Sequence, residues 1–138
     1  MTGVFESRSV EETQALARRF AKSLKPGDIV RLEGDLGAGK TAFVQGIAAE
    51  LGTGGHVSSP TFCIVREHPG AVRLVHMDLY RLQSGADLEA IGWDDYVASG
   101  AIIAVEWPER AEDVIPRDAK RVSFETDRAS DTRRITFS

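Results

Sequence analysis

Cysteine is almost absent from this sequence, since Cys63 is the only one among 138 residues. A single thiol excludes an internal disulfide, so we expect a reducing, cytoplasmic setting. No apolar run approaches the length of a membrane span, and charged residues follow soon after Met1. We therefore expect neither a membrane segment nor a signal peptide.

The chain also lacks an excess of positive charge. It has 17 Lys and Arg against 21 Asp and Glu, which gives a net charge of −4 and a pI near 5.4. Nucleic-acid backbones need a basic surface, so we do not expect this chain to bind nucleic acid alone. The most basic stretch lies near the C-terminus and contains Arg117, Lys120, Arg121, Arg128, Arg133 and Arg134. We interpret these residues as a solvated face.

Periodicity predicts alternating helices and strands. Ser9 and Glu12 fit a capping box in which each side chain bonds the other's amide, and an apolar stripe of helical spacing follows until Pro26 and Gly27. A second helix is predicted over residues 43–51, and a partly helical stretch over 82–98. Strands are predicted near residues 29–32, 62–66, 72–77 and 101–105, with a closing hairpin near 122–124 and 135–137.

The strongest motif lies between the first predicted strand and the second helix. It consists of Gly34, Asp35, Leu36, Gly37, Ala38, Gly39, Lys40 and Thr41, and it matches the phosphate-binding pattern G-x-x-x-x-G-K-[ST] in full. The glycines permit a close approach of the backbone to phosphate, and the helix amides point at the anion. Lys40 is expected to neutralise β- and γ-phosphate charge, and the Thr41 hydroxyl to ligate Mg²⁺. The motif predicts a nucleotide-binding P-loop.

Two carboxylates follow apolar strands at the edge where ligands bind in open α/β sheets: Asp78 and Glu106. One is expected to hold Mg²⁺ and the other to orient or deprotonate the attacking water. These residues alone do not indicate which takes which role. His76 shares a strand face with Asp78, an arrangement that permits a hydrogen bond between them. The three histidines lack metal-ligand spacing, and zinc is not expected.

We expect residues 1–138 to form a single P-loop domain, and the family resemblance described next implies that it is an ATPase domain. Its fold class is predicted as α/β, a P-loop NTPase-like three-layer sandwich. The sheet is predicted to be mixed and mainly parallel, with helices on both faces.

Four segments together resemble the bacterial TsaE (YjeE) family of tRNA threonylcarbamoyladenosine biosynthesis ATPases. They are residues 32–41 (LEGDLGAGKT), 59–62 (SPTF), 76–82 (HMDLYRL) and 105–110 (VEWPER). The resemblance implies an ATP-hydrolysing subunit, with ATP and Mg²⁺ as cofactors, that is slow alone and activated by partners. The resemblance further implies that this subunit is required for threonylcarbamoylation of adenosine 37 in tRNAs that read ANN codons. The implied partners are the other subunits of the transfer complex, TsaD and TsaB, with tRNA reached through the complex and no membrane.

The resemblance also implies roles for single residues. Lys40 and Thr41 contact phosphate and Mg²⁺, Glu106 is the second metal ligand, and Asp78 acts in hydrolysis. Thr61 belongs to a switch-like loop that meets the γ-phosphate. Three further implied roles concern the rest of the nucleotide: Trp107 lies beside it, while Glu12 with Thr13, and Arg133, flank the adenine.

Two other functions fit a P-loop. A small-molecule kinase needs an acceptor pocket and commonly a lid with several arginines, but residues 82–98 contain no arginine. A nucleotide switch that does not hydrolyse is the other alternative, and the pair of carboxylates argues against it.

Overall fold

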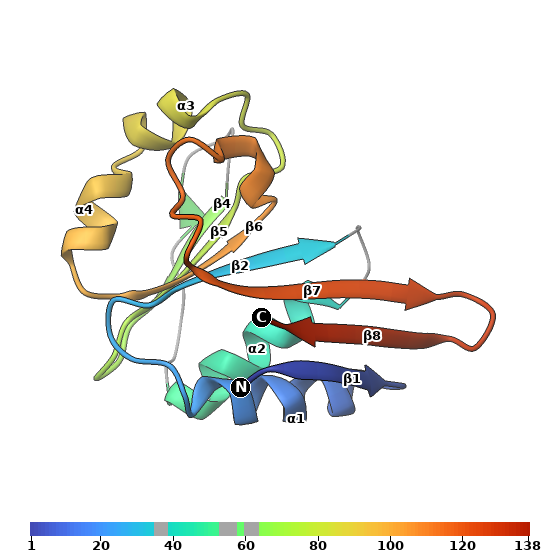
Figure 1. Ribbon diagram of the computed structural model, residues 1–138. Helices are drawn as coiled ribbons and strands as arrows, with labels where there is room; N and C mark the ends of the chain where they lie inside the picture. Colours follow the sequence, from blue (N-terminus) through green and yellow to red (C-terminus); the bar gives the residue numbers. More distant parts are fainter. Residues whose placement is uncertain (35–38, 53–57, 60–63) are drawn as a thin grey trace.

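The computed structural model describes residues 1–34, 39–52, 58–59 and 64–138. The strands in this part of the chain form one eight-stranded sheet in the order β1-β8-β7-β2-β6-β5-β4-β3 (Figure 1). The strands are β1 (Gly3–Ser7), β2 (Ile29–Gly34), β3 (Ser58–Ser59), β4 (Ile64–His68), β5 (Leu74–Asp78), β6 (Ile102–Glu106), β7 (Lys120–Asp127) and β8 (Thr132–Phe137). The helices are α1 (Val10–Ala21), α2 (Lys40–Leu51), α3 (Gly85–Ala90), α4 (Trp93–Ala98) and the 3-10 helix η1 (Pro108–Ala111).

The sheet is mixed, as predicted, but the prediction that it is mainly parallel is wrong. Only the centre is parallel, where β2 pairs with β6 and β7 and where β5 pairs with β6. The pairs β1–β8, β7–β8, β4–β5 and β3–β4 are antiparallel. The physical reason is connection length, because the short turns after β4 and β7 cannot carry a parallel crossover. Strand β1 was not predicted, since its partner β8 lies at the other end of the chain.

Helices cover both faces of the sheet. On β6, Ile102 and Ala104 belong to the core beneath α1 and α2, whereas Ile103 and Val105 belong to the core beneath α3, α4 and η1. This alternation buries β6 on both faces, as its continuous apolar run predicted. Figure 1 shows α1 and α2 together on one side and the two short helices on the other. Among the described helices, none combines the length and apolar character needed to cross a membrane.

Helix α1 begins at the predicted cap. The Ser9 hydroxyl accepts from the Glu12 amide at 3.1 Å. The return bond differs from the prediction, because Glu12 Oε2 accepts from the amide of Arg8 at 2.7 Å rather than from that of Ser9. The segment before the helix folds back, with Ser7 Oγ donating to the Ser9 carbonyl, and this brings the Arg8 amide within reach.

Helices α1 and α2 cross closely at Gly46. A Cβ built there would lie 2.6 Å from both Ala17 Cβ and the Gln14 carbonyl oxygen. Helix α2 ends at Gly52, which adopts the left-handed conformation (φ 68°) that is common at helix C-termini. The absence of a side chain at Gly46 therefore sets how near α1 lies to the helix that follows the glycine-rich loop.

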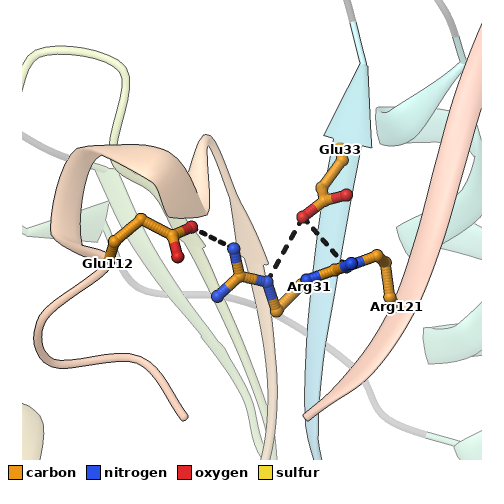
Figure 2. A network of polar contacts seen from close by, with 4 residues as sticks. All are labelled: Arg31, Glu33, Glu112 and Arg121. Atoms are coloured by element: carbon orange, nitrogen blue, oxygen red, sulfur yellow. Dashed lines mark hydrogen bonds and ion pairs between the residues drawn. The ribbon is translucent and has the colours of Figure 1, made fainter. Parts of the chain in front are cut away.

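A charged network ties β2 to its neighbours on the other face (Figure 2). Arg31 is 2% exposed and contacts Glu33 at 3.3 Å and Glu112, which follows η1. Arg121 of β7 contacts the same Glu33 oxygen at 3.2 Å. A buried guanidinium needs such carboxylate partners. The network links the strand that leads into the loop, the segment after β6, and β7.

Candidate functional site

The glycine-rich motif connects the central strand β2 to α2, and its two described glycines are required by the backbone. Gly34 has φ 138°, and a Cβ there would lie 2.4 Å from the Phe124 carbonyl oxygen. Gly39 has φ 100° and is the N-cap of α2. Four predicted phosphate-loop residues (Asp35, Leu36, Gly37 and Ala38) lie outside the described residues, as does Thr61 of the predicted switch-like loop.

The N-terminus of α2 is arranged to receive an anion. Its N-cap residue, Gly39, has no side chain to cap it, and its first turn contains no acidic residue. Among the described residues of the loop and the first turn, no carboxylate therefore competes for the amides there or for the positive end of the helix dipole. Lys40 donates from Nζ to the Gly34 carbonyl at 2.7 Å, while Thr41 is exposed. Lys40 and Thr41, the predicted phosphate and metal residues, therefore both lie in the first turn of α2.

The two predicted carboxylates lie together. Asp78 ends β5, Glu106 ends the neighbouring β6, and the two are paired in register. Asp78 Oδ1 accepts from the Tyr80 amide at 3.0 Å. Glu106 is 7% exposed, and its Oε2 lies 2.5 Å from Nε2 of the equally buried His76. The suggested bond from His76 to Asp78 is therefore replaced by a bond to Glu106, which the register of β5 and β6 brings close.

Trp107 follows Glu106 in a left-handed conformation (φ 57°), which is uncommon for a large side chain. Its ring lies under the Lys40 ammonium, with Nζ 4.3 Å from the ring centroid. Tyr80 packs on Trp107 at 5.0 Å between centroids, and the Arg110 guanidinium lies 5.7 Å from the Tyr80 centroid. No roles were predicted for Tyr80 and Arg110 from the sequence, although both lie in segments that carry the family resemblance.

Three residues were expected to flank the adenine, and two of them converge on Gly39. A Cβ at Gly39 would lie 3.3 Å from Arg133 Cδ and 3.8 Å from Thr13 Cγ2. Thr13 is buried and its hydroxyl bonds Ser7 Oγ at 2.7 Å. The third, Glu12, lies beside Thr13 at the start of α1, where its carboxylate accepts from the Arg8 amide. Helix α1 and strand β8 therefore both lie next to the N-terminus of α2.

A cavity of about 410 Å³ lies between α2 and the strands β4 and β5. Its lining residues are Thr41, Val44, Gln45, Ala48, Ala49, Arg66, His68 and His76. Thr41 and His76 therefore line one space, and His76 also bonds Glu106.

The C-terminal basic residues do not gather into one patch. Arg121 pairs with Glu33, and Arg134 lies 4.0 Å from Glu125. Arg133 lies against Gly39, and its neighbours along β8 alternate to the opposite face of the sheet. The interpretation of a solvated face holds for the exposed Arg117, Arg128 and Arg134, whereas Arg133 is half-buried against Gly39.

The fold and the site together define a mixed α/β protein. Its glycine-rich connection leads from a central strand into an uncapped helix, beside two strand-end carboxylates. Residues 7–135 match the family model described as "Threonylcarbamoyl adenosine biosynthesis protein TsaE". The chain therefore belongs to the TsaE family, as the resemblance predicted.

Individual relatives agree with this assignment. The tRNA threonylcarbamoyladenosine biosynthesis protein TsaE of Bacillus subtilis is 43% identical over 129 residues, which cover 93% of this chain and 80% of the relative. The protein of the same name from Streptomyces coelicolor is 41% identical over 130 residues, covering 89% of this chain and 87% of the relative. The crystal structure of Bacillus subtilis YdiB matches with a TM-score of 0.78 and 35% identity, covering 99% of this chain and 84% of that one.

Proposed function

We propose that this chain binds and slowly hydrolyses ATP with Mg²⁺, as a P-loop ATPase serving threonylcarbamoyladenosine biosynthesis on tRNA. The uncapped first turn of α2 is the observation that carries the proposal, because it presents Lys40 and Thr41 beside the Asp78–Glu106 pair. The names of the relatives support the pathway. The proposed partners are TsaD and TsaB, the other subunits of the transfer complex, and tRNA is reached through them.

The side chains present suit ATP with Mg²⁺. In the described part of the chain, no three His, Cys, Asp or Glu side chains converge as a metal site. Mg²⁺ commonly takes only one or two protein oxygens and completes its shell with phosphate oxygens and water. Thr41 and Glu106 are the proposed protein ligands. When bound, the ion supplies positive charge against the β- and γ-phosphates.

The remaining residues have complementary roles in the proposal. Lys40 leaves the Gly34 carbonyl to contact phosphate, and the α2 amides orient the same groups. Asp78 is held by the Tyr80 amide and orients or deprotonates the attacking water. Trp107 lies beside the phosphates, and Thr13 and Arg133 border the nucleotide from the side of Gly39.

The direct test is nucleotide titration of Lys40→Ala by calorimetry, with ATP and GTP measured in parallel. Removing a charged donor to phosphate is expected to weaken ATP binding by about tenfold or more. Lys25→Ala removes the same charge from the exposed connection between α1 and β2 and should bind as the wild type does. Thermal unfolding of both variants checks the fold. Unchanged ATP affinity in a folded Lys40→Ala protein would remove the P-loop assignment.

A small-molecule kinase is the second candidate, and the cavity beside Thr41 is the observation that favours it. A space of about 410 Å³ has room for a small acceptor next to the phosphates. The two functions differ in their products. Free phosphate released from ATP without any added acceptor supports the ATPase, whereas turnover that requires a metabolite supports the kinase.

A further inference from the structure

The pair formed by His76 and Glu106 is buried at the point where β5 and β6 end. His76 is 6% exposed and Glu106 is 7% exposed, and the Nε2 and Oε2 atoms are 2.5 Å apart. His76 is in register with Ala104, two residues before Glu106, so the bond crosses diagonally between the strands. A carboxylate buried to this degree needs a donor, and His76 supplies one to a single oxygen.

We propose that His76 is a positioning residue that holds Glu106 with its second oxygen turned toward the Mg²⁺ site. This inference rests on the proposed function, in which Glu106 is a metal ligand. Carboxylates that bind metals are themselves commonly oriented by hydrogen bonds from neighbouring groups. With Oε2 held by the imidazole, rotation of the carboxylate is restricted, and no hydrogen bond from a described residue occupies Oε1.

Two further observations support a role in the site rather than in the core alone. His76 and Thr41, the other proposed metal ligand, line the same cavity, so the pair lies on the side of the sheet where α2 begins. Asp78 has a separate donor in the Tyr80 amide. Each strand-end carboxylate therefore has its own positioning contact, and a change at His76 should affect Glu106 without releasing Asp78.

Three substitutions separate positioning from packing. His76→Gln places an amide N–H near the position of Nε2, whereas the shorter His76→Asn places one near Nδ1, and His76→Ala removes the donor. Mg²⁺ affinity is measured by calorimetry on protein saturated with a non-hydrolysable ATP analogue. Analogue affinity without Mg²⁺ and thermal unfolding are measured on the same samples.

We expect the Ala and Asn variants to lose about 10- to 100-fold in Mg²⁺ affinity, the range found for outer-shell partners of metal ligands. The Gln variant should stay close to wild type, and analogue affinity without Mg²⁺ should not change. His68→Gln is the matched control. It alters a histidine that lines the same cavity but lies at the end of β4 away from Asp78 and Glu106, where it is in register with Leu74.

The outcomes distinguish the inference from the function beneath it. If wild-type nucleotide binding does not depend on Mg²⁺, the proposed function fails and the inference fails with it. If Glu106→Gln loses Mg²⁺ affinity while His76→Ala retains it, only the inference is wrong. If all His76 variants, Gln included, lose Mg²⁺ affinity in proportion to a fall in unfolding temperature, the role is structural and the inference is also overturned.

Discussion

Lys40 illustrates how single side chains at the site hold one another. Its ammonium donates to the Gly34 carbonyl at 2.7 Å and lies 4.3 Å from the Trp107 ring centroid. Trp107 directly follows Glu106, and in its left-handed conformation its ring contacts the lysine. A buried charge is stable only with such partners. The lysine is therefore oriented near the first turn of α2 by contacts from two different strand ends.

The two strand-end carboxylates are expected to respond differently to neutralisation. Glu106→Gln should weaken the Mg²⁺ dependence of ATP binding, because an amide oxygen is a poorer ligand than a carboxylate. Asp78→Asn keeps an oxygen for the Tyr80 amide, so it should bind ATP normally and lose about 100-fold or more in hydrolysis. Calorimetry with and without Mg²⁺, together with phosphate release, measures both effects. If the two variants exchange these behaviours, the proposed roles are reversed.

At the scale of elements, the site depends on how closely α1 approaches α2. Thr13 near the start of α1 lies beside Gly39, and the crossing at Gly46 fixes the spacing of the two helices. Strand β8 contributes Arg133 to the same place, because the β7–β8 hairpin pairs with β2. Two elements that are remote from each other in the sequence, α1 and β8, therefore both lie against Gly39.

Gly46→Ala is expected to destabilise the protein by about 1–3 kcal/mol, because the added methyl overpacks the contact with Ala17 and Gln14. Helix propensity alone predicts the opposite, a gain of about 0.5–1 kcal/mol. Urea unfolding measures the difference. Adding Ala17→Gly should recover part of the loss, since it removes one of the two obstructing groups. Unchanged or increased stability of the single variant would show that the helices move apart without cost.

For the molecule as a whole, the arrangement of arginines bears on the rate of the proposed hydrolysis. Fast P-loop hydrolysis uses a cation at the transition state, often supplied by another protein. Arg31, the arginine nearest the loop in sequence, is held by Glu33 and Glu112, but the fold brings Arg133 against Gly39 and Arg110 over Tyr80. The isolated chain therefore has basic groups at the border of the site. Their distance from the γ-phosphate would set the rate of ATP hydrolysis by the chain without partners.

We expect ATP turnover to rise about tenfold or more when the proposed partner subunits are added, because docking completes the site. Phosphate release is measured for the chain alone, for the partners alone and for the mixture. The mixture containing Lys40→Ala protein is the control for turnover by other components. Equal rates with and without partners would contradict activation and leave Arg133 as the candidate internal cation.

The sequence alone determined the features that depend on local patterns. Apolar spacing predicted α1, the strands at the sheet centre and the β7–β8 hairpin, and the glycine pattern with Lys40 and Thr41 indicated the connection from β2 to α2. The motif segments were sufficient for the family, which the comparisons confirmed. Strand ends also predicted that Asp78 and Glu106 lie close, since neighbouring parallel strands end at the same edge.

Only the tertiary structure decided the contacts between segments distant along the chain. The pairing of β1 with β8, the bond from His76 to Glu106 rather than to Asp78, and the position of Arg133 against Gly39 all depend on register and packing. Periodicity shows which face a residue lies on, but it does not show which residue of another strand lies opposite. That choice is made by the fit of side chains across the assembled sheet, and it has no local trace in the sequence.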